Sequence, residues 1–327
     1  MKRILAVLTI ALPALLFCRP SSAATPRIIP IWPHLNIPLS QRHPKKNQIG
    51  VLLAPVRWPE LTCYPAPANN NSGTAVIICP GGGYVSEWVP PEGVAPAKWF
   101  NHIGMNCFIL RYRLPDGKLP PGGVPWPLQD VRRAVQIVRA HAKQWHINPH
   151  RVGVMGFSAG GSVASLAGVH WLPGNPAASD PLNRFSTRPD FMVLCYPVIS
   201  MIPGITHPGS HDALLGRHPP LDVEQYFSSE LNVTALTPPA FICFAHDDPL
   251  VPTANSIRFY KALRKNGVPA ELRMFKLGGH GFGMGRPGTG TVKWPKECER
   301  WLRKMHFLPR DNPPATWRQS SKLRRGR

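Results

Sequence analysis

Short, nearly uninterrupted apolar runs recur along the chain between residues 74 and 276, separated by segments in which apolar and polar residues alternate with helical spacing. Such runs are typical of parallel strands buried on both faces, and the amphipathic segments between them are typical of covering helices. The pattern predicts strands at 74–79, 107–112, 151–155, 190–196, 240–245 and 271–276, and helices at about 127–145, 159–169, 253–266 and 295–305. We therefore expect an α/β domain with a mostly parallel central sheet and helices on both faces.

Several segments do not follow this alternation. Residues 24–72 are rich in Pro and Asn and contain extended runs at 51–53 and 61–64, so we expect them to wrap the domain and supply its edge strands. Residues 171–188 and 200–235 carry Pro, Gly and His and follow predicted strands. We expect both to be irregular loops that contact a substrate.

The N-terminal residues have the pattern of a secretory signal. Two basic residues precede an apolar run at 4–17, which is short for a membrane span, and small residues follow at 21–23. We expect residues 1–23 to be a cleaved signal peptide, which predicts a secreted or periplasmic protein. Lipidation at Cys18 is disfavoured because the preceding Phe17 is bulky.

The chain is strongly basic. Its 38 Lys and Arg outnumber its 17 Asp and Glu, for a net charge of +21. Such a charge suits an acidic polysaccharide, an envelope surface or a nucleic acid, but no nucleic-acid-binding motif is present, and a solvated basic surface is the simpler explanation. Part of the charge lies in residues 309–327, which we expect to be a disordered basic tail after an α/β domain at 73–308.

Six cysteines lie outside the expected signal peptide, most of them within apolar strand-like runs. Free cysteines in such runs are commonly buried and behave as small apolar side chains, so we expect thiols rather than disulfides. No C-x-x-C pair is present, and the sequence therefore predicts neither a zinc site nor another metal or organic cofactor.

The segment Gly156–Gly161 reads Gly-Phe-Ser-Ala-Gly-Gly and lies between a predicted strand and a predicted helix. This is the context of a G-x-S-x-G nucleophile elbow, in which a tight turn exposes the hydroxyl of Ser158. The turn would also direct the N–H of Ala159 at a developing oxyanion. The alternative, a Gly-rich turn that binds phosphate at a helix N-terminus, would leave the acid and the histidine described next without a role.

Candidate partners for Ser158 follow it in the chain. Asp247 and Asp248 come after the strand predicted at 240–245, and His280 follows the next strand. A serine hydroxyl becomes an effective nucleophile when a positioned imidazole accepts its proton and a carboxylate orients that imidazole. The spacing alone leaves both aspartates open as the acid.

A glycine run, Pro80-Gly81-Gly82-Gly83-Tyr84, follows the first predicted strand of the domain. This position suits a loop whose backbone N–H groups stabilise an oxyanion. We predict an oxyanion hole formed by the N–H of Ala159 with one or two of those of Gly82, Gly83 and Tyr84.

Other polar and aromatic residues have structural explanations at this stage. Asp130 near a helix start suits a structural role, and Glu92 with Arg111 would suit an ion pair. Tyr84 and Trp88 would suit either a stacking surface for a sugar or a place in the core.

With these motifs the chain resembles the α/β-hydrolase esterases that include acetylxylan esterases and related carbohydrate esterases. The resemblance extends from about Leu61 to about Leu302, and its segments are 79–84, 112–114, 127–134, 156–161, 196–199, 248–252 and 279–282. It implies the α/β-hydrolase fold, with Ser158 as nucleophile, His280 as base and Asp248 as acid.

The resemblance also implies a secreted serine esterase that removes acetyl or other short acyl groups from saccharides through an acyl-enzyme, with no cofactor. Its expected partner is a small acyl ester or an acetylated saccharide. Two alternatives stay open: a serine exopeptidase of the prolyl-oligopeptidase type, which shares this fold and triad order, and a non-catalytic glycan- or polyanion-binding protein on a hydrolase scaffold.

Overall fold

The computed structural model describes residues 27–32, 52–53 and 58–309. The signal peptide expected at 1–23 lies outside them, as does the tail expected at 309–327 apart from Pro309. Within the described ranges, no helix combines the length and the apolar character needed to span a bilayer.

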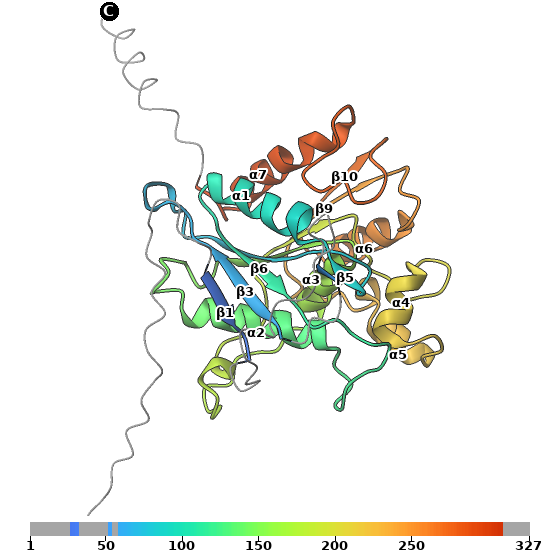
Figure 1. Ribbon diagram of the computed structural model, residues 1–327, viewed down its shortest axis with the longest axis horizontal. Helices are drawn as coiled ribbons and strands as arrows, with labels where there is room; N and C mark the ends of the chain where they lie inside the picture. The colour runs from blue at the N-terminus through green and yellow to red at the C-terminus, as the bar shows by residue number, and fades with distance from the viewer. Residues whose placement is uncertain (1–26, 33–51, 54–57, 310–327) are drawn as a thin grey trace, which may run out of the picture.

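One eight-stranded sheet forms the centre of the molecule, in the order β1-β3-β6-β4-β7-β8-β9-β10 (Figure 1). Its strands are β1 (Arg27–Pro30), β3 (Glu60–Tyr64), β4 (Ala75–Cys79), β6 (Asn106–Arg111), β7 (Val152–Phe157), β8 (Met192–Cys195), β9 (Ala240–Ala245) and β10 (Ala270–Phe275). Six neighbouring strands pair in parallel, namely β6, β4, β7, β8, β9 and β10. At one edge, β3 pairs antiparallel with β6 and β1 pairs antiparallel with β3. The predicted mostly parallel sheet is confirmed.

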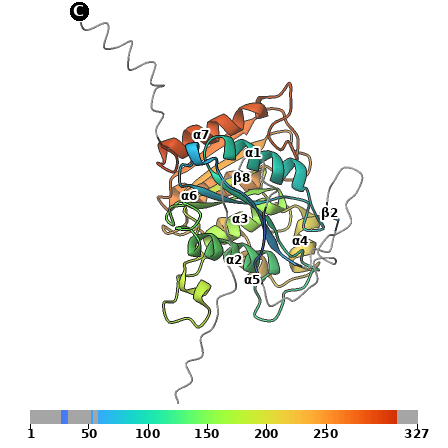
Figure 2. The same cartoon turned by 60° about the vertical axis from the view of Figure 1, so that its left-hand side comes forward.

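Helices cover both faces of this sheet, as predicted. Along β4, Ala75, Ile77 and Cys79 face one apolar core, while Val76 and Ile78 face the other. The first core includes side chains of α2 (Trp126–Ala140), α3 (Ala159–Val169) and α6 (Ala254–Lys265), and the second those of α1 (Ala95–His102) and α7 (Trp294–Lys304). Figure 2 shows α1 and α7 on one side of the sheet and α2 and α3 on the other.

The expectation of an irregular loop at 200–235 is wrong. This segment contains α4 (Pro208–Leu215), α5 (Leu221–Tyr226) and the short 3-10 helix η5 (Ser229–Leu231). These helices are too short for an apolar period to become visible in the sequence. The segment is ordered by packing instead, because Leu214 and Phe227 are buried in the core beneath it.

The expected ion pair between Glu92 and Arg111 is also wrong. Arg111 Nη1 lies 2.9 Å from Glu60 Oε1, and its Nε lies 3.7 Å from a carboxylate oxygen of Glu87. Glu87 belongs to β5 (Ser86–Glu87), which pairs with β2 (Leu52–Leu53).

Asp130 is structural as expected: it is fully buried and accepts hydrogen bonds from Arg113. The six described cysteines are all buried, as predicted.

Candidate active site

Ser158 occupies the sharp turn between β7 and α3. Its backbone has φ 51° and ψ −120°, a conformation that a residue with a side chain seldom adopts and that costs about 1–3 kcal/mol. Two backbone hydrogen bonds tie the turn to the end of β8 and the residues after it: the Ser158 N–H donates to the carbonyl of Cys195 at 3.1 Å, and its carbonyl accepts from the Val198 N–H at 3.0 Å. The turn places the side chain at the wall of a cavity.

The glycines two residues on either side of Ser158 are required by close backbone contacts. A Cβ added at Gly156 would lie 2.0 Å from the carbonyl oxygen of Gly160, and one added at Gly160 would lie 2.0 Å from that of Cys79. No side chain fits at such separations. The G-x-S-x-G spacing therefore follows from packing the first turn of α3 against the ends of β7 and β4.

His280, in the loop after β10, contacts both of its predicted partners. Its Nε2 lies 2.8 Å from Ser158 Oγ and its Nδ1 lies 2.7 Å from Asp248 Oδ2. Asp248 Oδ1 accepts from the N–H groups of Leu250 and Val251, both at 2.9 Å, which fixes the carboxylate. A neutral imidazole held by a carboxylate at Nδ1 presents Nε2 as the acceptor for the serine proton.

Asp247, the other candidate acid, is directed elsewhere. Its carboxylate accepts a 2.8 Å hydrogen bond from the Gly279 N–H, which is the main cause of its lowered pKa. It is exposed, whereas the side chain of Asp248 is only 2% exposed. The geometry thus selects Asp248 for contact with His280 and leaves Asp247 as a support for the loop that carries the imidazole.

The glycine loop packs directly against Ser158, since a Cβ added at Gly81 would lie 2.9 Å from Ser158 Cβ. The Gly81 N–H donates to Glu92 and is not free for a ligand. Gly82 and Gly83 line the cavity and have φ 133° and 64°. Within the described part of the chain their N–H groups have no acceptor.

The remaining predicted oxyanion donors differ in environment. Ala159 is the first residue of α3, so its N–H has no intrahelical partner. Tyr84 is fully buried, which rules out its use as a stacking surface for a sugar. Trp88, in contrast, is 44% exposed and lines the cavity.

Glu92 and Tyr196 form a buried hydrogen-bonded pair that was not predicted from the sequence. Glu92 accepts hydrogen bonds from the Gly81 N–H and the Tyr196 hydroxyl, both at 2.8 Å, and that hydroxyl accepts from the Gly283 N–H at 3.0 Å. Burial raises the pKa of Glu92. Tyr196 belongs to a segment that carries the family resemblance, but its type gives no sign that it bonds a carboxylate more than a hundred residues away.

The cavity at Ser158 and His280 has a volume of about 380 Å³. Besides these two side chains and the glycine loop, its walls include Trp88, Glu92, His207, Leu250 and Arg286. This volume lies within the range of small-molecule sites. Across the residues that the structure describes, no group of three or more His, Cys, Asp or Glu is arranged to hold a metal ion.

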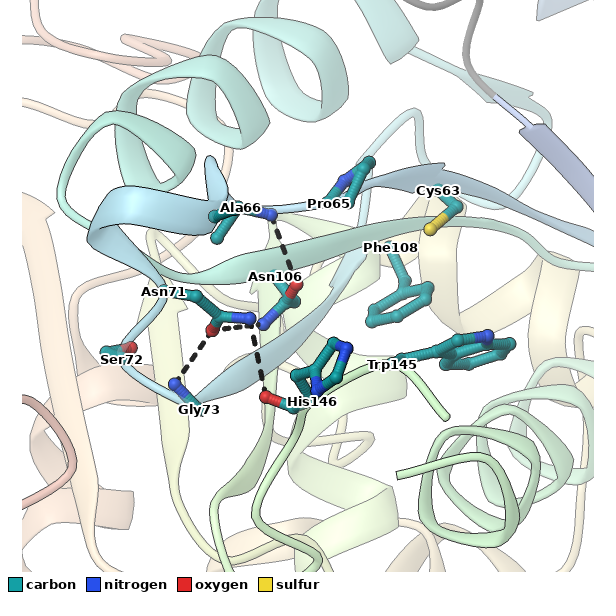
Figure 3. Close-up of a pocket in the computed structure, with 11 residues that line it drawn as sticks. Cys63, Pro65, Ala66, Asn71, Ser72, Gly73, Asn106, Phe108, Trp145 and His146 are labelled. Atoms are coloured by element: carbon teal, nitrogen blue, oxygen red, sulfur yellow. Dashed lines mark hydrogen bonds between the residues drawn. The ribbon is translucent and has the colours of Figure 1, made fainter. Parts of the chain in front are cut away.

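A second cavity, of about 550 Å³, lies beside the residues that begin β4 and β6, at the opposite ends of those strands from Ser158 (Figure 3). Its amide side chains bond to one another: Asn106 Nδ2 donates to Asn71 Oδ1 at 3.0 Å, and the Ala66 N–H donates to Asn106 Oδ1 at 3.1 Å. These contacts brace the turn before β4. Ligands of open parallel sheets bind beyond the carboxyl ends of the strands, so the cavity at Ser158 is the candidate active site.

Residues 61–263, more than half of the chain, match the model of the family described as BD-FAE. The chain belongs to the BD-FAE family. An acetylxylan esterase from Xylanibacter ruminicola is 38% identical over 238 residues, which are 72% of this chain and 46% of that protein. Endo-1,4-beta-xylanase B from Butyrivibrio fibrisolvens is 37% identical over 63% of this chain and 32% of its own length. This BD-FAE member therefore spans less than half the length of these two relatives.

Solved structures agree with the family assignment. An acetyl ester-xyloside bifunctional hydrolase from Caldicellulosiruptor lactoaceticus is 38% identical, with a TM-score of 0.75, over 88% of this chain and 100% of that one. A carboxylesterase from Lactobacillus plantarum shares the fold at 23% identity, with a TM-score of 0.63 over 80% of this chain and 98% of its own. The BD-FAE chain thus has the α/β-hydrolase fold and resembles acetylxylan esterases, as its motifs implied.

Proposed function

We propose that this BD-FAE protein is a serine esterase that removes acetyl or other short acyl groups from saccharides. The observation that carries the proposal is the position of the His280 imidazole, within hydrogen-bonding distance of both Ser158 Oγ and the Asp248 carboxylate. The names of the relatives support an ester substrate on a xylan-type saccharide. The cavity volume of about 380 Å³ suits a small acyl group with part of a sugar.

In the proposed mechanism, Ser158 Oγ attacks the carbonyl carbon of the ester while His280 Nε2 accepts the serine proton. Asp248 stabilises the resulting imidazolium through Nδ1. The oxyanion accepts hydrogen bonds from the Ala159 N–H and from an N–H of the glycine loop, Gly82 or Gly83. His280 then gives the proton to the alcohol oxygen as its bond to the acyl carbon breaks.

The second half of the reaction repeats the same steps with water. His280 Nε2 removes a proton from a water molecule as its oxygen attacks the acyl-enzyme carbonyl. The bond from Ser158 Oγ to the acyl carbon breaks and the serine regains its proton from the imidazolium. A carboxylic acid and the free hydroxyl of the saccharide are the products, and the residues return to their starting state.

Hydrolysis of 4-nitrophenyl acetate by the wild type, Ser158→Ala and Ser186→Ala tests the proposal. Ser186 Oγ donates to the Leu172 carbonyl at 3.2 Å and accepts from the Arg188 N–H at 3.1 Å, and Ser186 is not among the residues that line the cavity at Ser158, so it is a matched control. We expect Ser158→Ala to lower kcat by at least about 10³-fold and Ser186→Ala to match the wild type. A fluorophosphonate should label the wild type but not Ser158→Ala.

Three results would contradict the proposal. Equal rates for the wild type and Ser158→Ala would remove the serine from the chemistry. Absence of fluorophosphonate labelling in the wild type would favour a binding protein without catalysis. Cleavage of aminoacyl-prolyl amides together with no release of acetate from acetylated xylan would favour an exopeptidase.

We also propose that the protein acts after export, on the strength of the signal-like pattern of residues 1–23. N-terminal sequencing of the full-length gene product, recovered from its host, provides the test. A mature N-terminus close to Ala24 in the periplasm or the medium is expected. A cytoplasmic product that keeps its first residues would contradict the proposal.

A further inference from the structure

Arg286 lines the active-site cavity from the loop that follows His280. Residue Arg286 is exposed, and among the described residues no ion pair joins its guanidinium to a carboxylate. The positive charge of Arg286 contributes to the lowered pKa of Asp247, but the Asp247 carboxylate already accepts a hydrogen bond from the Gly279 N–H. A cation in the wall of a substrate cavity without an ion-pair partner is available to an anionic group of the substrate.

His207 supplies a hydrogen-bond donor to the same cavity. Its Nδ1 accepts from the Ser210 N–H at 3.2 Å and lies 2.9 Å from Ser210 Oγ, so the neutral ring carries its proton on Nε2. Burial, followed by the neighbouring His280, lowers the pKa of His207, which keeps the ring neutral. A neutral imidazole N–H of this kind suits a sugar hydroxyl.

The other polar wall of the cavity does not compete for Arg286. Glu92 is 4% exposed, and both of its carboxylate oxygens accept hydrogen bonds from within the protein. Trp88 offers a partly exposed indole, which presents a broad apolar plane beside the polar groups. The cavity thus combines a cation that has no ion-pair partner in the described part of the chain, a neutral hydrogen-bond donor and an aromatic plane around the reactive hydroxyl.

We propose that the acyl ester hydrolysed at this site lies on an acidic saccharide, whose uronosyl carboxylate binds Arg286 while its ring contacts Trp88 and His207. The inference rests on the proposed esterase function and adds its substrate class. A guanidinium pairs well with a carboxylate because its N–H groups form a planar fork. The excess of Lys and Arg over Asp and Glu, which persists without Lys2, Arg3 and Arg19 of the expected signal peptide, supports the same conclusion, since a basic protein attracts a polyanionic polysaccharide from a distance.

The test compares O-acetylated galacturonan oligomers as free acids with the same oligomers after methyl esterification of their carboxyl groups. The readout is the acid preference, defined as kcat/KM for acetate release from the free acid divided by that from the methyl ester. We expect the wild type to prefer the free acid, and the preference to decline with added salt. Arg286→Gln should lower the preference by about tenfold or more, mainly through KM, with Arg286→Lys in between.

Arg264→Gln is the matched control because it removes the same charge. Arg264 is an exposed residue in the last turn of α6, which precedes β10 and therefore lies at the end of the sheet away from the site. Its acid preference should equal that of the wild type. An equal drop in both variants would show that net charge, and not the cavity, selects the substrate, and would overturn the inference.

Two further results would also overturn it: a wild type that hydrolyses both oligomers equally well, or an Arg286→Gln variant that keeps the full acid preference. A carboxylate preference seen only on the acyl side, with 4-nitrophenyl hemiglutarate and not with the uronate oligomers, would do the same. Each of these outcomes leaves the esterase proposal intact, because that proposal is judged with the neutral ester 4-nitrophenyl acetate and Ser158→Ala.

Discussion

The hydroxyl of Tyr196 donates a 2.8 Å hydrogen bond to the buried carboxylate of Glu92. Through this pair, two loops on either side of Ser158 are joined: Glu92 accepts from the Gly81 N–H in the glycine loop, and the Tyr196 hydroxyl accepts from the Gly283 N–H in the His280 loop. The Tyr196 ring also packs edge-on against the imidazole, with ring centroids 4.9 Å apart. The pair therefore positions the predicted oxyanion donors and the base relative to each other.

Replacing Tyr196 by Phe should weaken both loops at once. The change leaves a Glu92 oxygen and the Gly283 N–H buried without their partner, which costs about 1–3 kcal/mol for each unsatisfied group. We expect a lower free energy of unfolding in urea and a lower kcat on 4-nitrophenyl acetate. Tyr226→Phe is the control, because that side chain is 49% exposed and should change neither quantity. Unaltered stability in Tyr196→Phe would show that the pair does not brace the site.

The two neighbouring aspartates should respond very differently to amide substitution. Asp248→Asn should lower kcat by about 10⁴-fold, because an amide can donate to His280 Nδ1 and so stabilise the wrong tautomer. Asp247→Asn keeps an oxygen that accepts the Gly279 N–H, so we expect less than about a tenfold loss. Steady-state kinetics on 4-nitrophenyl acetate measure both. The reverse order of effects would identify Asp247 as the acid.

Glu87 should make stability depend on pH. Burial raises the pKa of this carboxyl from 4.5 to about 8, against the opposing effects of Arg111 and of the hydrogen bond from the Tyr112 N–H. A group whose pKa is higher in the folded state contributes stability that is fully present below pH 4.5 and is lost as the pH rises through about 8. The free energy of unfolding should therefore decline between these values, by about 1.4 kcal/mol for each unit of pKa difference.

The measurement is urea unfolding of the wild type and Glu87→Gln at pH 5, 7 and 9. Because glutamine does not ionise, the wild type should lose stability relative to the variant as the pH rises. Asp222→Asn, at an exposed position in α5, is the control and should follow the wild type. A wild-type curve parallel to that of Glu87→Gln over this range would contradict the assigned pKa.

The features predicted correctly from the sequence are those that depend on neighbouring residues. The apolar runs indicated strands because burial on both faces of a parallel sheet removes polar residues from them, as in β4 and β7. The elbow at Ser158 was visible because its close contacts involve glycines two residues away. The short helices α4 and α5 were missed because they are defined by contacts with the core rather than by a repeat of their own.

What the sequence by itself determined is the α/β sheet, the strained turn at Ser158 and the order of the three candidate triad residues, since local spacing and apolar pattern encode them. Spacing left Asp247 and Asp248 both open, the family resemblance favoured Asp248, and the tertiary structure places His280 against Asp248. Only the tertiary structure decided that Glu92 bonds Tyr196 and that Arg286 lines the cavity without an ion-pair partner among the described residues. Each of these contacts joins segments that follow different strands of the sheet. They depend on how the loops pack together in three dimensions, which residue type and spacing do not specify.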